Sequence, residues 1–209
     1  YPLDDVSKNR DEIKRGVDLG LWGLSLASSY WQTTIDSPVM YPTFEAALKY
    51  SMPVFIHPSV RINQWGGEKY NMYTTVARED DIAKALVEMV FGVLPRFPSL
   101  KVIVAHLGGG LPALKGRLLT WHQPEGFPVP EEDRSQGLSV HRAKKLGLVD
   151  DFERRIEHVL FDAAGYGGWP PVMEAAFRAL GADHLCYGTD YPYEMNKAPH
   201  AKRFIEDID

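Results

Sequence analysis

The sequence predicts an α/β fold, in which helices alternate with the strands of a parallel sheet. Five short apolar runs are continuous, which is typical of strands buried on both faces of a parallel sheet. These runs cover residues 21–26, 53–56, 102–105, 159–161 and 185–187. Stripes of apolar residues with helical spacing lie between the runs, so we expect a right-handed crossover from each strand to the next.

The clearest helical pattern covers residues 80–94. Its apolar residues recur at spacings of three and four and therefore form one stripe, which ends at Pro95. Asp80 and Asp81 suit the first turn of such a helix. The same kind of pattern predicts further helices over residues 9–19, 42–50 and 170–180.

Two long polar connections interrupt this alternation. Residues 59–79 follow the second run, and residues 122–151, which include three prolines, separate the third run from the fourth. Connections of this length in a compact domain are usually functional loops or inserted segments. We therefore expect a single domain over residues 1–209, with a polar, proline-containing excursion at about 122–151.

Composition excludes several classes of protein. The 209 residues include 23 Lys and Arg and 28 Asp and Glu, a formal net charge of -5, and 44% are hydrophobic, as in one soluble globular domain. The chain lacks the clustered basic residues of a nucleic-acid-binding protein. No apolar run approaches the roughly 18 residues of a membrane-spanning helix, so we expect no membrane partner. The single cysteine, Cys186, excludes a disulfide scaffold and favours a cytoplasmic protein.

Polar residues stand where the predicted strands end. Four of the five apolar runs lead into a histidine or an aspartate, namely His57, His106, Asp162 and Asp190. The carboxyl ends of parallel strands meet at one edge of a sheet, where ligands bind and catalytic groups converge. Imidazole nitrogens and carboxylate oxygens are the usual ligands of a catalytic Zn²⁺ or a similar divalent ion. His57 and Asp190 are therefore candidate metal ligands.

Each of these four residues also has a structural interpretation, since a histidine at a strand end often bonds to a carbonyl and an aspartate often caps a turn. His158 and His184 precede their strands, at the opposite edge, and we interpret both as structural. Cys186 lies within a run and is interpreted as a small core residue. The glycines after His106 match no dinucleotide-binding fingerprint, which argues against a flavin or nicotinamide enzyme, and are expected to permit a close backbone approach.

Four segments, taken together and in order, resemble the amidohydrolase-related family of the amidohydrolase superfamily, the group that includes aminocarboxymuconate-semialdehyde decarboxylase. They read PVFIHPS, RFPSLKVIVAHLGGGLPAL, VLFDAAG and CYGTDYPY. The resemblance covers nearly the whole chain. It implies a TIM-barrel-type (β/α)₈ fold, of which this chain resembles strands 4–8 with the first three βα units absent. It also implies one divalent metal ion, for which we expect Zn, with Mn or Fe as alternatives.

The resemblance implies a role for each strand-end residue. His57 is similar to the metal-binding histidine of the family's fifth strand, and Asp190 to the metal-binding aspartate of the eighth, which we expect to act as ligand and proton acceptor together. His106 resembles the acid/base histidine of the sixth strand, and Asp162 the seventh-strand aspartate, to which we assign the orientation of its neighbours. The family's first strand carries a His-x-His metal pair, and none of the seven histidines in this sequence stands two residues from another.

The function implied by the resemblance is that of a metal-dependent decarboxylase or hydrolase acting on a small cyclic or unsaturated carboxylic acid. The residues do not distinguish the two reactions, because both need a metal and a proton-transferring imidazole. Candidate substrate contacts in the loop after His57 are Arg61, Asn63 and Trp65, although a solvated loop face is an equal alternative.

A catalytically inactive, truncated barrel that acts only as a structural or binding module is the competing interpretation. The missing His-x-His pair favours inactivity, whereas the retained strand-end residues favour an enzyme. An open sheet would expose unpaired backbone groups and apolar surface. We therefore expect a homo-oligomer that binds a small-molecule carboxylate, and no nucleic-acid partner.

Overall fold

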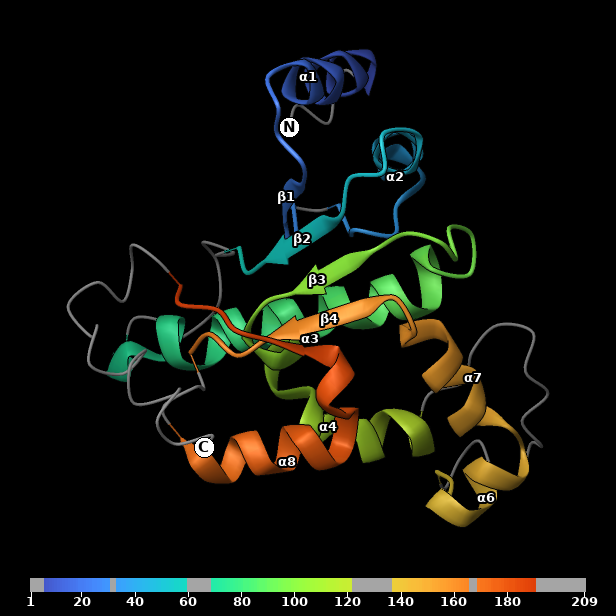
Figure 1. The fold of residues 1–209 in the computed structure, drawn as a ribbon. Coiled ribbons are helices and arrows are strands. Elements are labelled where there is room, and N and C mark those ends of the chain that lie inside the picture. Colours follow the sequence, from blue (N-terminus) through green and yellow to red (C-terminus); the bar gives the residue numbers. More distant parts are fainter. Residues whose placement is uncertain (1–5, 31–32, 60–68, 122–136, 166–168, 191–209) are drawn as a thin grey trace.

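Five parallel strands form one sheet in which the strand order follows the chain order (Figure 1). The computed structural model describes residues 6–30, 33–59, 69–121, 137–165 and 169–190. The strands are β1 (Leu24–Ala27), β2 (Val54–His57), β3 (Val102–Val104), β4 (Val159–Asp162) and β5 (Leu185–Cys186). All four pairings between neighbours are parallel. The α/β prediction is confirmed, and each apolar run contains one strand.

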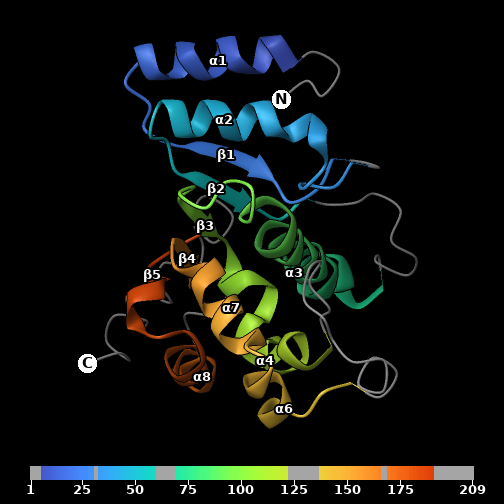
Figure 2. The ribbon, with the colours of Figure 1, turned by 90° about the vertical axis from the view of Figure 1, so that its right-hand side faces the viewer.

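The helices pack against one another along the sheet. Figure 2 shows α1 beside α2, and neighbouring packing pairs include α3 with α4 and α4 with α8. The α-helices are α1 (Val6–Asp18), α2 (Tyr41–Lys49), α3 (Arg78–Glu88), α4 (His106–Trp121), α6 (Val140–Lys145), α7 (Leu148–Ile156) and α8 (Pro170–Leu180). Shorter helical segments are η1 (Pro38–Met40), η2 (Lys69–Asn71), η3 (Tyr73–Ala77), η4 (Met89–Val93) and η5 (Ala182–His184). Among the described residues, no helix has the length and apolar character needed to cross a bilayer.

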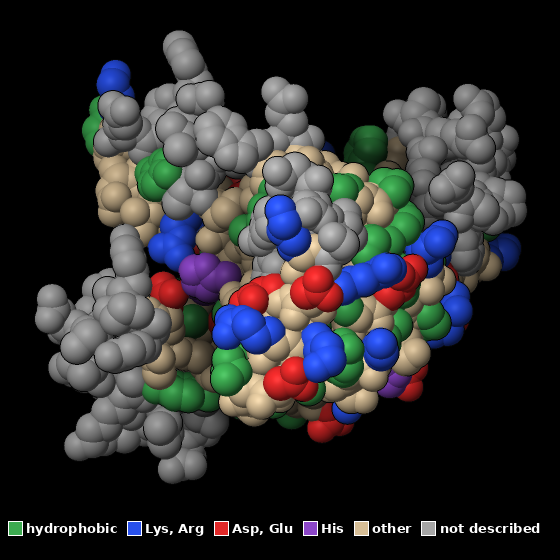
Figure 3. Space-filling view, turned by 90° about the horizontal axis from the view of Figure 1, so that it is seen from above, with side chains coloured by type: hydrophobic (Ala, Val, Ile, Leu, Met, Phe, Trp, Pro, Cys, Tyr) green, Lys and Arg blue, Asp and Glu red, His purple; other side chains and the backbone are tan. Residues whose placement is uncertain are grey.

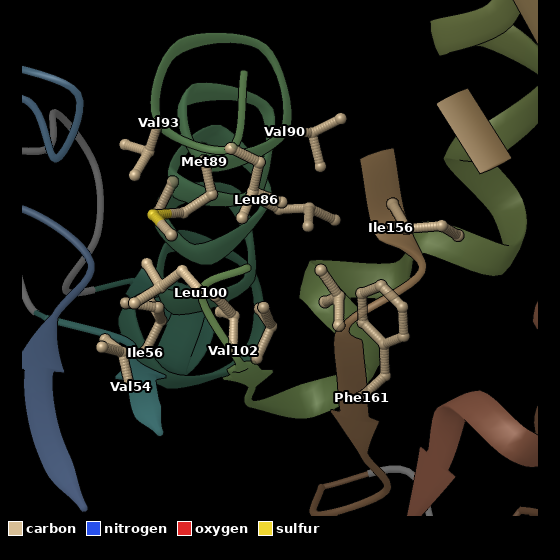
Figure 4. Close-up of a cluster of buried hydrophobic side chains, with 14 of the residues drawn as sticks. Val54, Ile56, Leu86, Met89, Val90, Val93, Leu100, Val102, Ile156 and Phe161 are labelled. Carbon is tan, nitrogen blue, oxygen red and sulfur yellow. The ribbon is translucent and has the colours of Figure 1, made fainter. Parts of the chain in front are cut away.

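The hydrophobic core lies between the sheet and the helices. Figure 4 shows Val54, Ile56 and Val102 on the strands near Leu86 and Met89 of the α3 and η4 segment, all of them buried. The strand residues between these point to the other face of the sheet, which we call the inner face. The inner face is apolar but only partly covered in the described residues, and it includes Phe55, Ile103 and Leu160. The prediction that both faces of the strands are buried is therefore confirmed only for the face that packs against the helices.

Two predicted connections contain helices. After a left-handed turn at Tyr70 and Asn71, helical structure runs from Met72 through η3 into α3, so Asp80 and Asp81 do not start a helix. The reason is that η3 is a π-helical turn, which leads into α3 without a capping residue. In the excursion predicted at about 122–151, residues 122–136 lie outside the described residues, and the remainder contains α6 and the start of α7.

The sequence also does not predict α4, because three glycines and Pro112 argue against a helix there. Its start is not a right-handed turn. His106, Leu107 and the glycines Gly108, Gly109 and Gly110 all have positive φ, from 50° to 82°. Histidine and leucine rarely adopt this left-handed conformation, and such residues concentrate at functional sites. The left-handed turn ends β3 and fixes the position of His106.

Candidate active site

Three candidate residues converge at the carboxyl edge of the sheet. His57 is the last residue of β2, His106 follows β3 after one residue, and Asp190 follows β5. Each offers one atom that could bind a metal ion, and these three atoms lie within 4.8 Å of one another. Figure 3, which views the molecule from above, shows a histidine side chain in a recess between an acidic and a basic side chain.

The His57 imidazole faces Asp190. Its Nε2 lies 3.3 Å from Asp190 Oδ1, and its Nδ1 donates to the carbonyl of Pro58 at 3.2 Å. Because a carbonyl only accepts, Nδ1 donates in the first contact, and Nε2 is the ring nitrogen that faces the Asp190 carboxylate. An imidazole nitrogen and a carboxylate oxygen placed in this way can both bind a divalent cation.

The His106 imidazole is held in a similar way by Glu79 at the start of α3. His106 Nδ1 donates to Glu79 Oε1 at 2.8 Å. This leaves Nε2 directed toward Asp190 Oδ2, 3.8 Å away. Nε2 is buried and has no hydrogen-bond partner among the described residues. A buried, unsatisfied imidazole nitrogen is rare and indicates a place for a ligand or ion, so the donor set fits a divalent metal.

Charge around His106 determines its protonation. Burial alone would lower the pKa of His106, but the hydrogen bond and negative charge of Glu79, with smaller effects of Asp190 and Asp162, raise that pKa above its usual value. Burial also raises the pKa of Asp162, against two backbone hydrogen bonds that lower it. The site therefore favours an imidazole that can hold a proton near neutral pH.

Asp162 is positioned to hold the backbone of His106. Its Oδ1 accepts the amide N–H of His106 at 2.9 Å and that of Ala164 at 3.1 Å. The carboxylate is buried at the end of β4. A Cβ on Gly188 would lie 2.9 Å from the carboxyl carbon, so only glycine fits beside it. This arrangement suits the orienting role that we expect for Asp162.

Two glycines allow α3 to approach the left-handed turn. A Cβ on Gly109 would lie 2.3 Å from the Glu79 carbonyl oxygen and 2.7 Å from the Ala83 nitrogen. A Cβ on Gly108 would lie 2.7 Å from a methyl group of Leu86. The close backbone approach expected for these glycines is confirmed. It brings the α3 residue Glu79 within hydrogen-bond distance of His106.

Sequence reasoning missed the α3 contribution. Glu79 contacts His106. Arg78 Nη2 lies 3.9 Å from Asp190 Oδ2, and the side chains of Arg78 and Asp190 are each only 11% exposed. The available signal was a run of four charged residues, 78–81, at one end of an apolar stripe. The candidate substrate contacts Arg61, Asn63 and Trp65 lie outside the described residues.

Two other predicted residues have structural surroundings. His184 Nδ1 donates to the carbonyl of Val159 at 2.8 Å, which agrees with a structural role before β5. Cys186 is half-buried in β5. Burial, followed by the nearby charge of Asp162, raises the pKa of the Cys186 thiol to about 11. The thiol is therefore a poor nucleophile near neutral pH.

Alkylation tests this last point. Only the thiolate reacts, so iodoacetamide should modify Cys186 about 100-fold more slowly at pH 8 than it modifies a free cysteine with a pKa of about 8.5. The rate should keep rising up to about pH 11, because the pKa of the folded thiol is raised. Mass spectrometry of the protein after timed quenching measures this rate. A rate that levels off near pH 9 would contradict the raised pKa.

Comparison with known proteins gives consistent matches. A family model described as amidohydrolase matches residues 1–207. The chain is 32% identical over 200 residues to 2-amino-3-carboxymuconate-6-semialdehyde decarboxylase of Dictyostelium discoideum, an alignment that covers 94% of this chain and 50% of the relative. It thus spans half the length of that curated relative.

Solved structures give the same fold. A 2,6-dihydroxybenzoate decarboxylase complexed with 2,6-dihydroxybenzoate matches with a TM-score of 0.72 and 22% identity, covering 99% of this chain and 62% of that one. The 5-carboxyvanillate decarboxylase of Novosphingobium aromaticivorans, complexed with manganese, matches with a TM-score of 0.69 and 19% identity, covering 100% and 56%. The expected fold class is confirmed, since the chain corresponds to part of a TIM-barrel-type fold.

Proposed function

Because this chain belongs to the amidohydrolase family, we propose that its protein is a metal-dependent decarboxylase acting on a small cyclic or unsaturated carboxylic acid, with aromatic acids the first candidates. The observation that supports this proposal most directly is the convergence of His57, His106 and Asp190, whose candidate ligand atoms lie within 4.8 Å of one another. The relatives and solved neighbours described above are themselves decarboxylases.

His57 Nε2 and the Asp190 carboxylate would hold one divalent ion. When bound, that ion supplies positive charge that polarises oxygen atoms of the substrate. Imidazole and carboxylate donors suit Zn²⁺, our expectation from the sequence, whereas one solved neighbour was complexed with manganese. Zn²⁺ and Mn²⁺ are therefore the two ions to test first.

His106 serves as the proton donor in this proposal. Loss of CO₂ breaks a carbon–carbon bond and leaves its electron pair on the carbon that carried the carboxylate, and this carbon must gain a proton. His106 can supply it from Nε2, because Glu79 stabilises the doubly protonated ring through Nδ1. Asp162 keeps the ring in place by accepting the backbone amide of His106. The ring regains its proton from water once the product has left.

Reconstitution tests the proposal. The purified protein is stripped with a chelator, reloaded with Zn²⁺ or Mn²⁺, and offered 2-amino-3-carboxymuconate 6-semialdehyde, 2,6-dihydroxybenzoate and 5-carboxyvanillate. We expect one metal equivalent per chain, lost in Asp190→Ala, and CO₂ release from at least one acid. A metal-loaded protein that hydrolyses lactones without releasing CO₂ would favour the hydrolase alternative. Failure to retain either metal would favour the inactive module.

The inner face of the sheet supports our proposal of a homo-oligomer. Leu160 of β4 is 36% exposed on this face. Tyr187 and Trp22, which line one hollow with Phe55 and Ile103 of the same face, are 47% and 79% exposed, and large apolar exposure of this kind is typical of interfaces. In sedimentation we expect a species heavier than one 23.6 kDa chain. A monomer with a sharp, cooperative melting transition would contradict this. The single cysteine supports our further proposal of a cytoplasmic location.

A further inference from the structure

A second buried carboxylate lies behind the site. Asp81 is on α3 and is 1% exposed. Its Oδ2 accepts the hydroxyl of Ser28, and that of Ser29 at 2.9 Å. The hydroxyl of Ser59 lies 3.2 Å from the same oxygen and 2.8 Å from Ser29 Oγ. The three hydroxyls satisfy Oδ2, whereas Oδ1 is buried and accepts no hydrogen bond among the described residues.

The three serines come from the two chain segments that leave β1 and β2. Ser28 and Ser29 directly follow β1, and Ser59 stands two residues after His57. Additional hydrogen bonds join these segments. The Ser59 amide donates to Ser28 Oγ at 2.8 Å, and the Ser28 amide donates to the His57 carbonyl, also at 2.8 Å. The His57 carbonyl is thus held by Ser28, and the segment that follows His57 is held through Ser59, and both serines bond to Asp81.

The same helix carries Glu79, which holds His106. Asp81 and Glu79 are two residues apart on α3, and they bond to different segments, one beside His57 and one at His106. The two imidazole ring centroids are 5.8 Å apart. A rigid helix that contacts both segments fixes this separation, on which the convergence of His57, His106 and Asp190 depends.

We infer that Asp81 is a positioning residue, which keeps the His57 imidazole directed at Asp190 by anchoring the Ser28, Ser29 and Ser59 segments to α3. It acts through these serines, to which its described hydrogen bonds go. The expected effect of Asp81 on metal affinity rests on the proposed function, whereas its expected effect on the orientation of the His57 imidazole does not.

The test replaces Asp81 by asparagine, with Asp80→Asn as the matched control. Asp80 is adjacent, and its side chain is 47% exposed and pairs with Lys84 on the surface of α3. Asparagine keeps the shape of Asp81 but removes the negative charge that the three hydroxyls stabilise, and its amide oxygen is a weaker acceptor than a carboxylate oxygen. If Asp81→Asn does not fold, the Ser59→Ala variant, which lacks one hydroxyl of the same network, takes the place of Asp81→Asn in both measurements.

The first measurement needs no metal. In the metal-free protein, the imidazole resonances of His57, assigned with a His57→Gln variant, should shift in Asp81→Asn and stay in place in Asp80→Asn. The second measurement is the Kd for Zn²⁺ alone, by competition with a chromophoric chelator. Loss of a group that orients a metal ligand weakens affinity about 10- to 100-fold, and we expect a change of that size in Asp81→Asn only.

The outcomes separate the two proposals. Unshifted His57 resonances in Asp81→Asn would overturn the inference. An unchanged Kd for Zn²⁺ in an Asp81→Asn protein with a lower Tm would also overturn it, because Asp81 would then contribute only to stability. If the unmodified protein binds no Zn²⁺ or Mn²⁺, the proposed function fails, and the His57 resonances alone decide the role of Asp81.

Discussion

Replacing His106 by asparagine is expected to lower kcat for decarboxylation by about 10²- to 10⁴-fold, the usual contribution of a general acid. Asparagine cannot deliver a proton from the position of Nε2. It is a suitable replacement because it tolerates the left-handed φ of 54° that His106 adopts better than most residues do. Initial rates at saturating substrate, with the metal-loaded protein, measure the effect.

The matched control is His158→Asn. His158 is exposed and precedes β4 at the opposite edge of the sheet, so its replacement should leave kcat unchanged. Elemental analysis of the His106 variant completes the design, since we expect its metal content to match that of the unmodified protein. Loss of metal together with activity would place His106 among the ligands, and full retention of activity would exclude it from proton transfer.

Replacing Gly109 by alanine is expected to destabilise the protein by about 2–5 kcal/mol, from the strain of a left-handed alanine and the cost of overpacking. The φ of Gly109 is 67°, and a Cβ there would lie 2.3 Å from the Glu79 carbonyl oxygen. For a chain of this size the Tm should fall by roughly 5–15 °C. Differential scanning calorimetry measures the Tm.

Gly116→Ala is the control for this prediction. Gly116 lies in α4, and nothing lies within 4 Å of a Cβ placed there. Its replacement should raise stability slightly, because alanine favours the helical interior by about 0.5–1 kcal/mol. Since the clash at Gly109 is with the backbone of α3, the alanine variant should also lose the Glu79 contact with His106 and be less active below its Tm. A Tm equal to that of the unmodified protein would show that α3 does not pack as described.

The strands and the bounds of α8 were predictable because local signals define them. Each strand lies in a continuous apolar run, and α8 is bounded by Pro170 and Gly181, which start and stop helices in most sequences. The helical segment before α3 gives no such signal. It passes through η3 without a capping side chain, so the apolar stripe alone suggested a start at Asp80.

The candidate site was predictable where strand ends supply it. His57, His106, Asp162 and Asp190 follow strands of one parallel sheet, and topology alone brings such ends together. The roles of Glu79 and Asp81 were not predictable from the sequence, because their contacts depend on how closely α3 approaches the strand ends. Gly108 and Gly109 permit that approach, and the sequence predicts a close approach at these glycines but not which helix makes it.

The agreement between strand order and chain order has a consequence for how the protein is made. Among the described residues, each strand from β2 to β5 pairs with the strand that precedes it in the chain, so these four pairings can form in the order of synthesis. During translation, each of these strands can add to an edge that already exists. Pairing with the preceding strand keeps the closed loops as short as parallel crossovers permit, which favours vectorial folding from the ribosome.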